Sequence, residues 1–89
     1  MDKYLLIYNN QVISKGETIK EVFQSVFEIQ IINANSSLFV EILHAGELII
    51  SLRHSYSLEW SKEEIKSDVM RNITNIMRHI TNIEFVKVV

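Results

Sequence analysis

The sequence predicts an α+β fold in which an antiparallel sheet carries two helices on one of its faces. Short segments of strand-forming residues alternate along the chain with two stretches of helical spacing, and turn residues separate them. The chain has 89 residues, enough for one compact domain but not for two. No stretch is rich in proline, glycine or serine, so we expect one domain over residues 1–89.

The N-terminal third predicts a strand, a hairpin and a helix. Residues 4–8 are aromatic, β-branched or leucine, and Asn9-Asn10 can take the positive φ of a tight turn into residues 11–14. After Gly16, Thr18 can cap a helix whose apolar residues recur at helical spacing: Ile19, Val22, Phe23, Val26 and Phe27. The helical spacing of apolar residues then ends. The isoleucine-rich segment 28–33 fits either the end of this helix or a further strand.

The remainder predicts a second hairpin, a second helix and a final strand. Residues 38–43 and 48–54 have strand composition and flank a turn at 44–47. Ser61 and Glu64 form a capping box that opens one long helical pattern: Ile65, Val69, Ile73, Ile76 and Ile80. Asn82 suits the left-handed residue that ends a helix, and residues 84–89 alternate as a last strand.

The predicted order of elements is strand, helix, strand, strand, helix, strand. This is the ferredoxin-like βαββαβ order, here elaborated by an N-terminal hairpin. A different α+β sheet with both helices on one face fits nearly as well. A fold that hosts many unrelated activities assigns no function by itself.

Composition excludes several classes of site. The chain has no cysteine, which rules out disulfides, thiolate nucleophiles and zinc sites that use sulfur. Its two glycines, at 16 and 46, allow neither a Walker A loop nor a dinucleotide fingerprint, so we expect no cofactor. The three histidines, 44, 54 and 79, fall on different elements without a second ligand at a recurring metal spacing, so we expect no metal.

Charge and hydropathy argue against two classes of binding partner, nucleic acids and membranes. A net charge of −2, without the basic-glycine-aromatic run of single-strand RNA platforms, argues against nucleic-acid binding. The apolar runs are far shorter than the roughly 20 residues that span a bilayer, so we expect no membrane partner. The N-terminus lacks the apolar core of a signal peptide, which predicts a cytoplasmic location.

One polar segment is a candidate site. Arg53, His54 and Tyr56, with two serines between and after them, bring a guanidinium, an imidazole and a phenol together near the end of a predicted strand. Such a group is able to serve acid/base chemistry or to bind an anion. The sequence identifies no oriented base or oxyanion donor beside it, so we assign no catalytic residue and expect His54 to be structural, buried or bonded to backbone.

The strands predict an apolar surface on the sheet. If Leu5, Ile7, Val40, Ile42, Ile50, Leu52, Val86 and Val88 face the helices, period two places a second apolar set on the opposite face. Contiguous exposed apolar patches are rare on monomers, so we expect this set to form a twofold homodimer interface. Its members are Tyr4, Leu6, Tyr8, Phe39, Leu43, Ile49, Phe85 and Val89.

Two hypotheses of function follow. The first is a small, non-enzymatic, cytoplasmic protein-binding module that acts as a homodimer through this apolar sheet face. The second is a small enzyme or ligand sensor of ferredoxin-like fold, with Arg53, His54 and Tyr56 in its pocket. A closed pocket with convergent polar groups would distinguish the second from the first.

Overall fold

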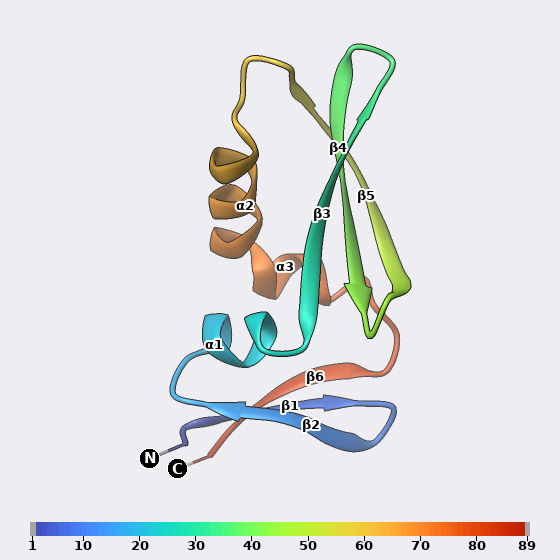
Figure 1. Cartoon of the computed structure of the whole chain (residues 1–89). Helices are drawn as coiled ribbons and strands as arrows, with labels where there is room; N and C mark the ends of the chain where they lie inside the picture. The colour runs from blue at the N-terminus through green and yellow to red at the C-terminus, as the bar shows by residue number, and fades with distance from the viewer. Residues whose placement is uncertain (1, 89) are drawn as a thin grey trace. The chain divides into compact units, whose positions relative to one another are not determined.

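The computed structural model describes residues 2–88 and shows an α+β protein with two antiparallel three-stranded sheets and three short helices (Figure 1). The described residues fall into two compact units. We call residues 2–26 and 72–88 the terminal unit and residues Phe27–Arg71 the central unit. Whether the two units make the single domain expected from the sequence stays a prediction.

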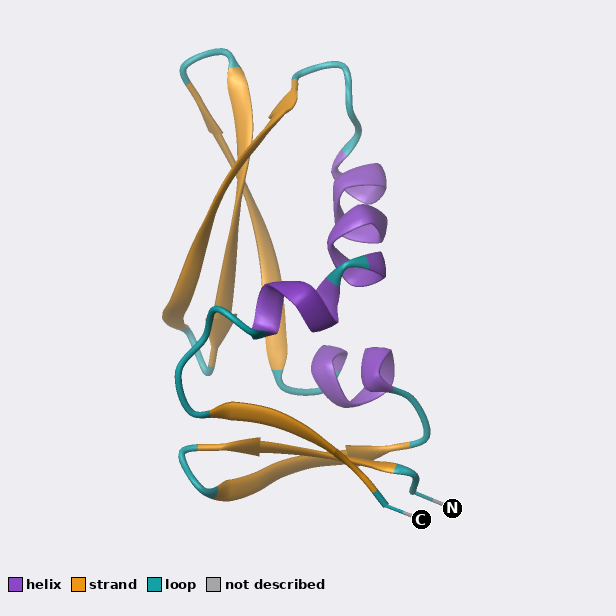
Figure 2. Cartoon of the chain, turned by 180° about the vertical axis from the view of Figure 1, so that it is seen from behind, coloured by secondary structure: helices purple, strands orange, loops and turns teal. Residues whose placement is uncertain are grey.

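The terminal unit is built on a sheet of strand order β2-β1-β6 (Figure 2). Its elements are β1 (Tyr4–Tyr8), β2 (Gln11–Gly16), α1 (Ile19–Gln24), α3 (Ile73–Met77) and β6 (Ile83–Lys87). Thr18 caps α1, because its hydroxyl accepts a hydrogen bond from the Glu21 N–H at 3.1 Å. The N-terminal hairpin and the cap at Thr18 are therefore as the sequence predicts.

Helix α1 covers one face of this sheet. The hydroxyl groups of Ser14 in β2 and Ser25 at the end of α1 are hydrogen-bonded. A Cβ placed on Gly16 would lie 3.1 Å from Val22 Cγ1 of α1, so the helix approaches the backbone of β2 closely. Leu6, whose Cα pairs with Ser14, is fully buried on this same face. The face that holds Leu6 is thus the core face of the terminal sheet.

The central unit consists of a sheet of order β3-β4-β5 and one helix. Its elements are β3 (Phe27–Ala34), β4 (Ser37–His44), β5 (Glu47–Ser57) and α2 (Lys62–Arg71). The segment that the sequence left open between helix and strand is a strand, β3. Strands β3 and β4 pair in unbroken register, whereas the β4–β5 pairing is interrupted twice, between Leu38 and Val40 and between Ile42 and Leu43.

Two-residue turns with positive φ connect the strands of each hairpin. They are Asn9-Asn10, Asn35-Ser36 and Ala45-Gly46. Positive φ at both central positions matches the right-handed twist of paired strands, and asparagine and glycine reach it at low cost. The turns predicted at Asn9-Asn10 and at 44–47 are confirmed, as is the left-handed conformation of Asn82, whose φ is 68°.

The core of the central unit lies between its sheet and α2. Val40 and Ile42 of β4 and Ile65 of α2 are fully buried, and Val69 is 1% exposed. The capping box at the start of α2 is confirmed: Glu64 N–H donates to the Ser61 hydroxyl, and Ser61 N–H donates to the Glu64 carboxylate, each at 3.1 Å. This helix therefore begins where the sequence predicts.

Two expectations about architecture require correction. Residues 2–88 form two sheets rather than one, and the ferredoxin-like order is not confirmed because these residues contain six strands. The tight turns join neighbouring strands into local hairpins, and β6 pairs with β1, so the strands divide between two sheets.

The predicted long second helix is also interrupted. It ends as α2 at Arg71, and Asn72, with φ −105° and ψ 14°, separates it from α3. Asparagine, threonine and β-branched isoleucine around this point have low helix propensity, which outweighs the continuous apolar spacing. The last strand, β6, begins one residue earlier than expected, and Val89 lies outside the described residues.

Candidate functional site

The predicted polar site lies in the central unit, around the buried ring of Tyr56. This side chain of β5 is 7% exposed, and its Cα pairs with that of Leu38. The exposed His54 ring lies nearly perpendicular to the Tyr56 ring, with their centroids 4.8 Å apart. The centroid of the Trp60 ring lies 5.2 Å from that of Tyr56. We call His54, Tyr56, Trp60 and Asp68 the Tyr56 cluster.

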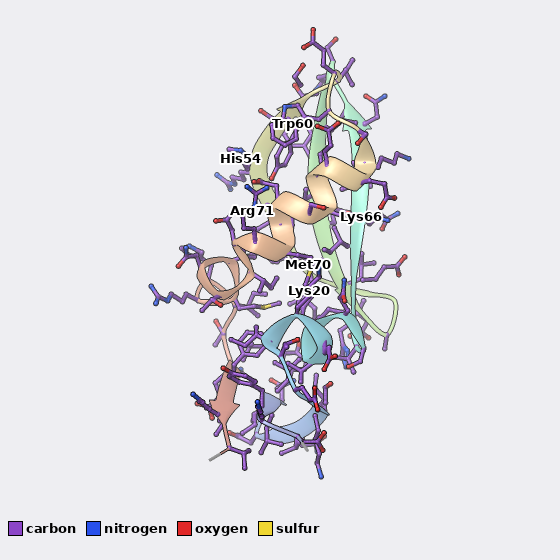
Figure 3. All side chains as sticks on the ribbon, turned by 90° about the vertical axis from the view of Figure 1, so that its left-hand side faces the viewer. Lys20, His54, Trp60, Lys66, Met70 and Arg71 are labelled. Carbon is purple, nitrogen blue, oxygen red and sulfur yellow. The ribbon has the colours of Figure 1, made fainter. Side chains whose placement is uncertain are left out.

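Asp68 of α2 completes this cluster. The Tyr56 hydroxyl donates a hydrogen bond of 2.7 Å to Asp68 Oδ2, and the exposed Arg71 approaches Asp68 Oδ1 at 3.7 Å. Burial, together with the hydrogen bond to a negative carboxylate, raises the pKa of Tyr56 to about 12. Figure 3 shows His54, Trp60 and Arg71 on the side of the central unit that α2 occupies.

The polar chemistry of the Tyr56 cluster links β5 to α2 through a hydrogen bond. The phenolic proton is engaged by Asp68, and the raised pKa extends the pH range in which the phenol stays protonated beyond its ordinary pKa of about 10. Arg53 and His54 are both exposed, so the buried form of a structural His54 does not apply, and a bond from His54 to backbone stays a prediction. Sequence reasoning identified Tyr56 but missed Asp68, since no local motif links residues twelve positions apart.

A shallow depression lies beside this cluster. It has a volume of about 400 Å³, opens to solvent, and is lined by Trp60, Glu63, Glu64, Ser67 and Arg71. Glu64 also accepts the capping bond from Ser61, which occupies one of its oxygens. The two carboxylates are solvated first-turn residues of α2 and complement its dipole. This opening is not the closed pocket with convergent polar groups that a small-molecule site requires.

The structure divides the predicted interface residues between the two units. Phe39, Leu43 and Ile49 belong to the central sheet and lie on the face opposite the buried Val40 and Ile42. Each of the three is half-buried, and Ile49 lies at the second interruption of the β4–β5 pairing.

The facing expected for the terminal sheet is reversed. Leu6 is fully buried under α1, and alternation places Tyr4 and Tyr8 on that same face. Phe85 pairs with Leu6 and shares the face as well. Ser14 and Gly16 of β2 on this side leave room for α1 to pack closely, which explains why this face is the covered one.

The opposite face of the terminal sheet is apolar and carries no helix of that unit (Figures 1 and 2). Leu5 and Ile7 occupy its centre, and both are half-buried. The register surrounds them with residues of β2 and β6, although a shift between Leu6 and Ile7 leaves Ile13 of β2 without a partner in β1. We call the paired residues the Leu5 face: Leu5, Ile7, Val12, Lys15, Glu84 and Val86. Val12 is 48% exposed, unusually open for a valine within a sheet.

A small depression indents one end of the Leu5 face. It has a volume of about 230 Å³, is open to solvent, and is lined by Ile7, Asn10, Asn82, Ile83 and Glu84. Two of these residues, Ile7 and Glu84, belong to the Leu5 face itself. The Leu5 face is therefore indented at the end that holds Ile7 and Glu84.

Comparison with protein families, curated proteins and solved structures finds no match to this chain. Within residues 2–88, none of the helices has the length and apolar character needed to cross a bilayer. The same residues contain no group of three or more side chains of metal-ligating type that could hold an ion.

Proposed function

We propose that this chain is a non-enzymatic protein-binding module that acts as a homodimer through the Leu5 face. The observation that carries the proposal is the apolar centre of a sheet face that no helix of its unit covers. Leu5, Ile7, Val12 and Val86 form one contiguous patch there, because the pairing places them on neighbouring strands. Contiguous exposed apolar patches are uncommon on monomers, and this supports an interaction site here.

The energetics favour association. Burying apolar surface contributes roughly 25 cal/mol per Å², and the central pair, Leu5 and Ile7, is only half-buried in the single chain. A chain of 89 residues also has a small core, so further burial between copies would add stability that the monomer lacks. Association needs no rearrangement of the terminal sheet, because the side chains of the Leu5 face already point away from α1.

The polar chemistry of the chain supports binding over catalysis. The Tyr56 hydroxyl donates its proton to the hydrogen bond with Asp68, so Tyr56 has no second proton to donate to a ligand. The His54 ring packs against the Tyr56 ring, and within residues 2–88 no hydrogen bond or ion pair to a carboxylate orients His54 as a base. The Tyr56 cluster therefore supports a structural role, and the sheet face supports the functional one.

A charged substitution in the patch tests the proposal. Val12→Glu would bury an unpaired carboxylate in each half of the interface, so we expect its dimer dissociation constant to rise at least tenfold. Because Val12 is already 48% exposed, the fold of the chain should tolerate the change. Light scattering across micromolar concentrations measures the mass of wild type and variant.

A matched control is available in the central unit. Leu48 is 55% exposed, so Leu48→Glu makes the same kind of change on an apolar residue of similar exposure outside the Leu5 face. It should leave the dimer intact. A wild-type chain that has the monomer mass at every concentration would refute the proposal, and a dimer weakened only by Leu48→Glu would move the interface to the central unit.

A further inference from the structure

The two charged residues of the Leu5 face stand at opposite corners. Lys15 of β2 pairs with Leu5, whereas Glu84 of β6 pairs with Ile7, two residues further along β1. Since β1 lies between β2 and β6, the lysine and the glutamate are on opposite edges and at opposite ends of the patch. The other two corners are apolar: Val12 beside Ile7, and Val86 beside Leu5.

We infer that the partner on this face is a second copy, related by a twofold axis that runs along the diagonal from Val12 to Val86. This inference rests on the proposed function and specifies its geometry. The rotation exchanges the charged corners, so Lys15 of each chain faces Glu84 of the partner subunit. One positive and one negative corner thus make two equivalent ion pairs, as the self-complementarity of a twofold interface requires.

The dimensions of the sheet allow this arrangement. Two strand spacings measure roughly 10 Å and two residues along a strand roughly 7 Å, so the patch is about two thirds as long as it is wide. Rotation about its diagonal then crosses the strands of the two copies at roughly 70°, which is closer to the orthogonal than to the aligned geometry of packed sheets. Leu5 and Ile7 of both copies meet near the axis.

Other twofold arrangements leave the charges unpaired. An axis parallel to β1 would set Lys15 against Val86 and Glu84 against Val12. An axis perpendicular to β1 within the face would set Lys15 against Val12 and Glu84 against Val86. Either arrangement buries a charge against an apolar side chain, which is costly without a compensating partner. The diagonal axis alone among these three pairs opposite charges.

Charge reversal tests the inference. Lys15→Glu alone places two like-charged pairs in the dimer, and so does Glu84→Lys, so we expect each single variant to dimerise about tenfold more weakly or worse. The double variant Lys15→Glu/Glu84→Lys recreates both ion pairs with the signs exchanged and should recover wild-type affinity. Both residues are exposed in the single chain, so these changes should leave the fold intact, as circular dichroism can verify.

Mixing the two single variants gives the sharpest result. A Lys15→Glu chain and a Glu84→Lys chain complement each other at both corners, so the mixture should form a heterodimer more tightly than either variant forms a homodimer. Native mass spectrometry of an isotope-labelled mixture measures this preference. Raising the salt concentration should reduce it, because screening acts most strongly on exposed ion pairs.

The outcomes separate this inference from the proposed function. A wild-type dimer whose affinity is unchanged in both single variants, or a mixture without heterodimer preference, would overturn the diagonal arrangement while the homodimer stands. A wild-type chain that never dimerises would overturn both. If a charge reversal unfolds the chain, the milder pair Lys15→Gln and Glu84→Gln replaces it, and either should weaken the dimer and reduce its salt dependence.

Discussion

Tyr56 links β5 to α2 through a single hydrogen bond, and this bond makes stability depend on alkaline pH. In the unfolded chain the phenol has its ordinary pKa of about 10, whereas in the folded protein the pKa is raised to about 12. Between these values the folded chain holds a proton that the unfolded chain has lost. The stabilisation is therefore complete below pH 10 and is lost as the pH rises toward about 12.

Tyr56→Phe tests this dependence. We expect the wild type to lose unfolding free energy above pH 10 faster than the variant, because phenylalanine keeps the ring but has no proton to lose. At neutral pH the variant should be less stable by roughly 1 to 3 kcal/mol, since Asp68 loses a donor at a partly buried site. Urea unfolding at several pH values measures both effects, and parallel pH curves for the two proteins would contradict the prediction.

At this scale the sequence revealed individual residues better than their partners. The polar segment that includes Tyr56 was evident because five polar or aromatic side chains follow one another. The acceptor Asp68 was not, because its contact with Tyr56 depends on how α2 packs on the sheet. A contact between a strand residue and a helix residue depends on the tertiary structure, so the spacing of residues along the sequence does not indicate it.

At the scale of elements, α2 and α3 allow the cap and the core to be compared. Ser61→Ala removes the capping hydroxyl of α2 and should cost about 1 kcal/mol. Ile73→Ala in α3, where the isoleucine is 4% exposed, should cost roughly 2 to 5 kcal/mol. The exposed Lys66→Ala serves as the control and should change little. Chemical denaturation measures all three, and equal losses for Ile73→Ala and Lys66→Ala would show that the isoleucine contributes no packing.

The ends of helices were predictable from the sequence where a capping or left-handed residue marks them, whereas the continuity of a helix was not. Thr18, Ser61 and Asn82 have the roles that their side chains favour. The break at Asn72 was missed because isoleucines at helical spacing continue across it, so the apolar pattern alone does not show where a helix is interrupted.

For the whole molecule, the sequence indicated the class of fold but not the division into two sheets. Alternation identifies which residues share a strand face, but it does not tell which face a helix covers. In the terminal sheet both sets, Leu5 with Ile7 and Leu6 with Tyr8, are apolar. The choice depends on the small side chains of β2 that admit α1, and these lie on a neighbouring strand.

Phe39→Glu tests the remaining sheet face of the protein. Phe39, Leu43 and Ile49 lie on the outer side of the central sheet, where the sequence placed part of the interface. If the Leu5 face forms the dimer, this substitution should leave the dissociation constant within about twofold of wild type. Analytical ultracentrifugation measures it, and a loss of dimer in Phe39→Glu, with Val12→Glu unaffected, would assign the interface to the central sheet.

The difference in regularity between β3 and β5 has a consequence for aggregation. Both strands form edges of the central sheet, so within residues 2–88 the outer row of backbone groups on each has no strand partner. The two interruptions in β5 disturb that row, as bulges on edge strands do in proteins that avoid joining sheet to sheet. Strand β3 has no such protection: its register is unbroken, and it contains three isoleucines, no proline and one charged residue, Glu28. Growth of a fibril from this chain would accordingly start by adding strands to β3.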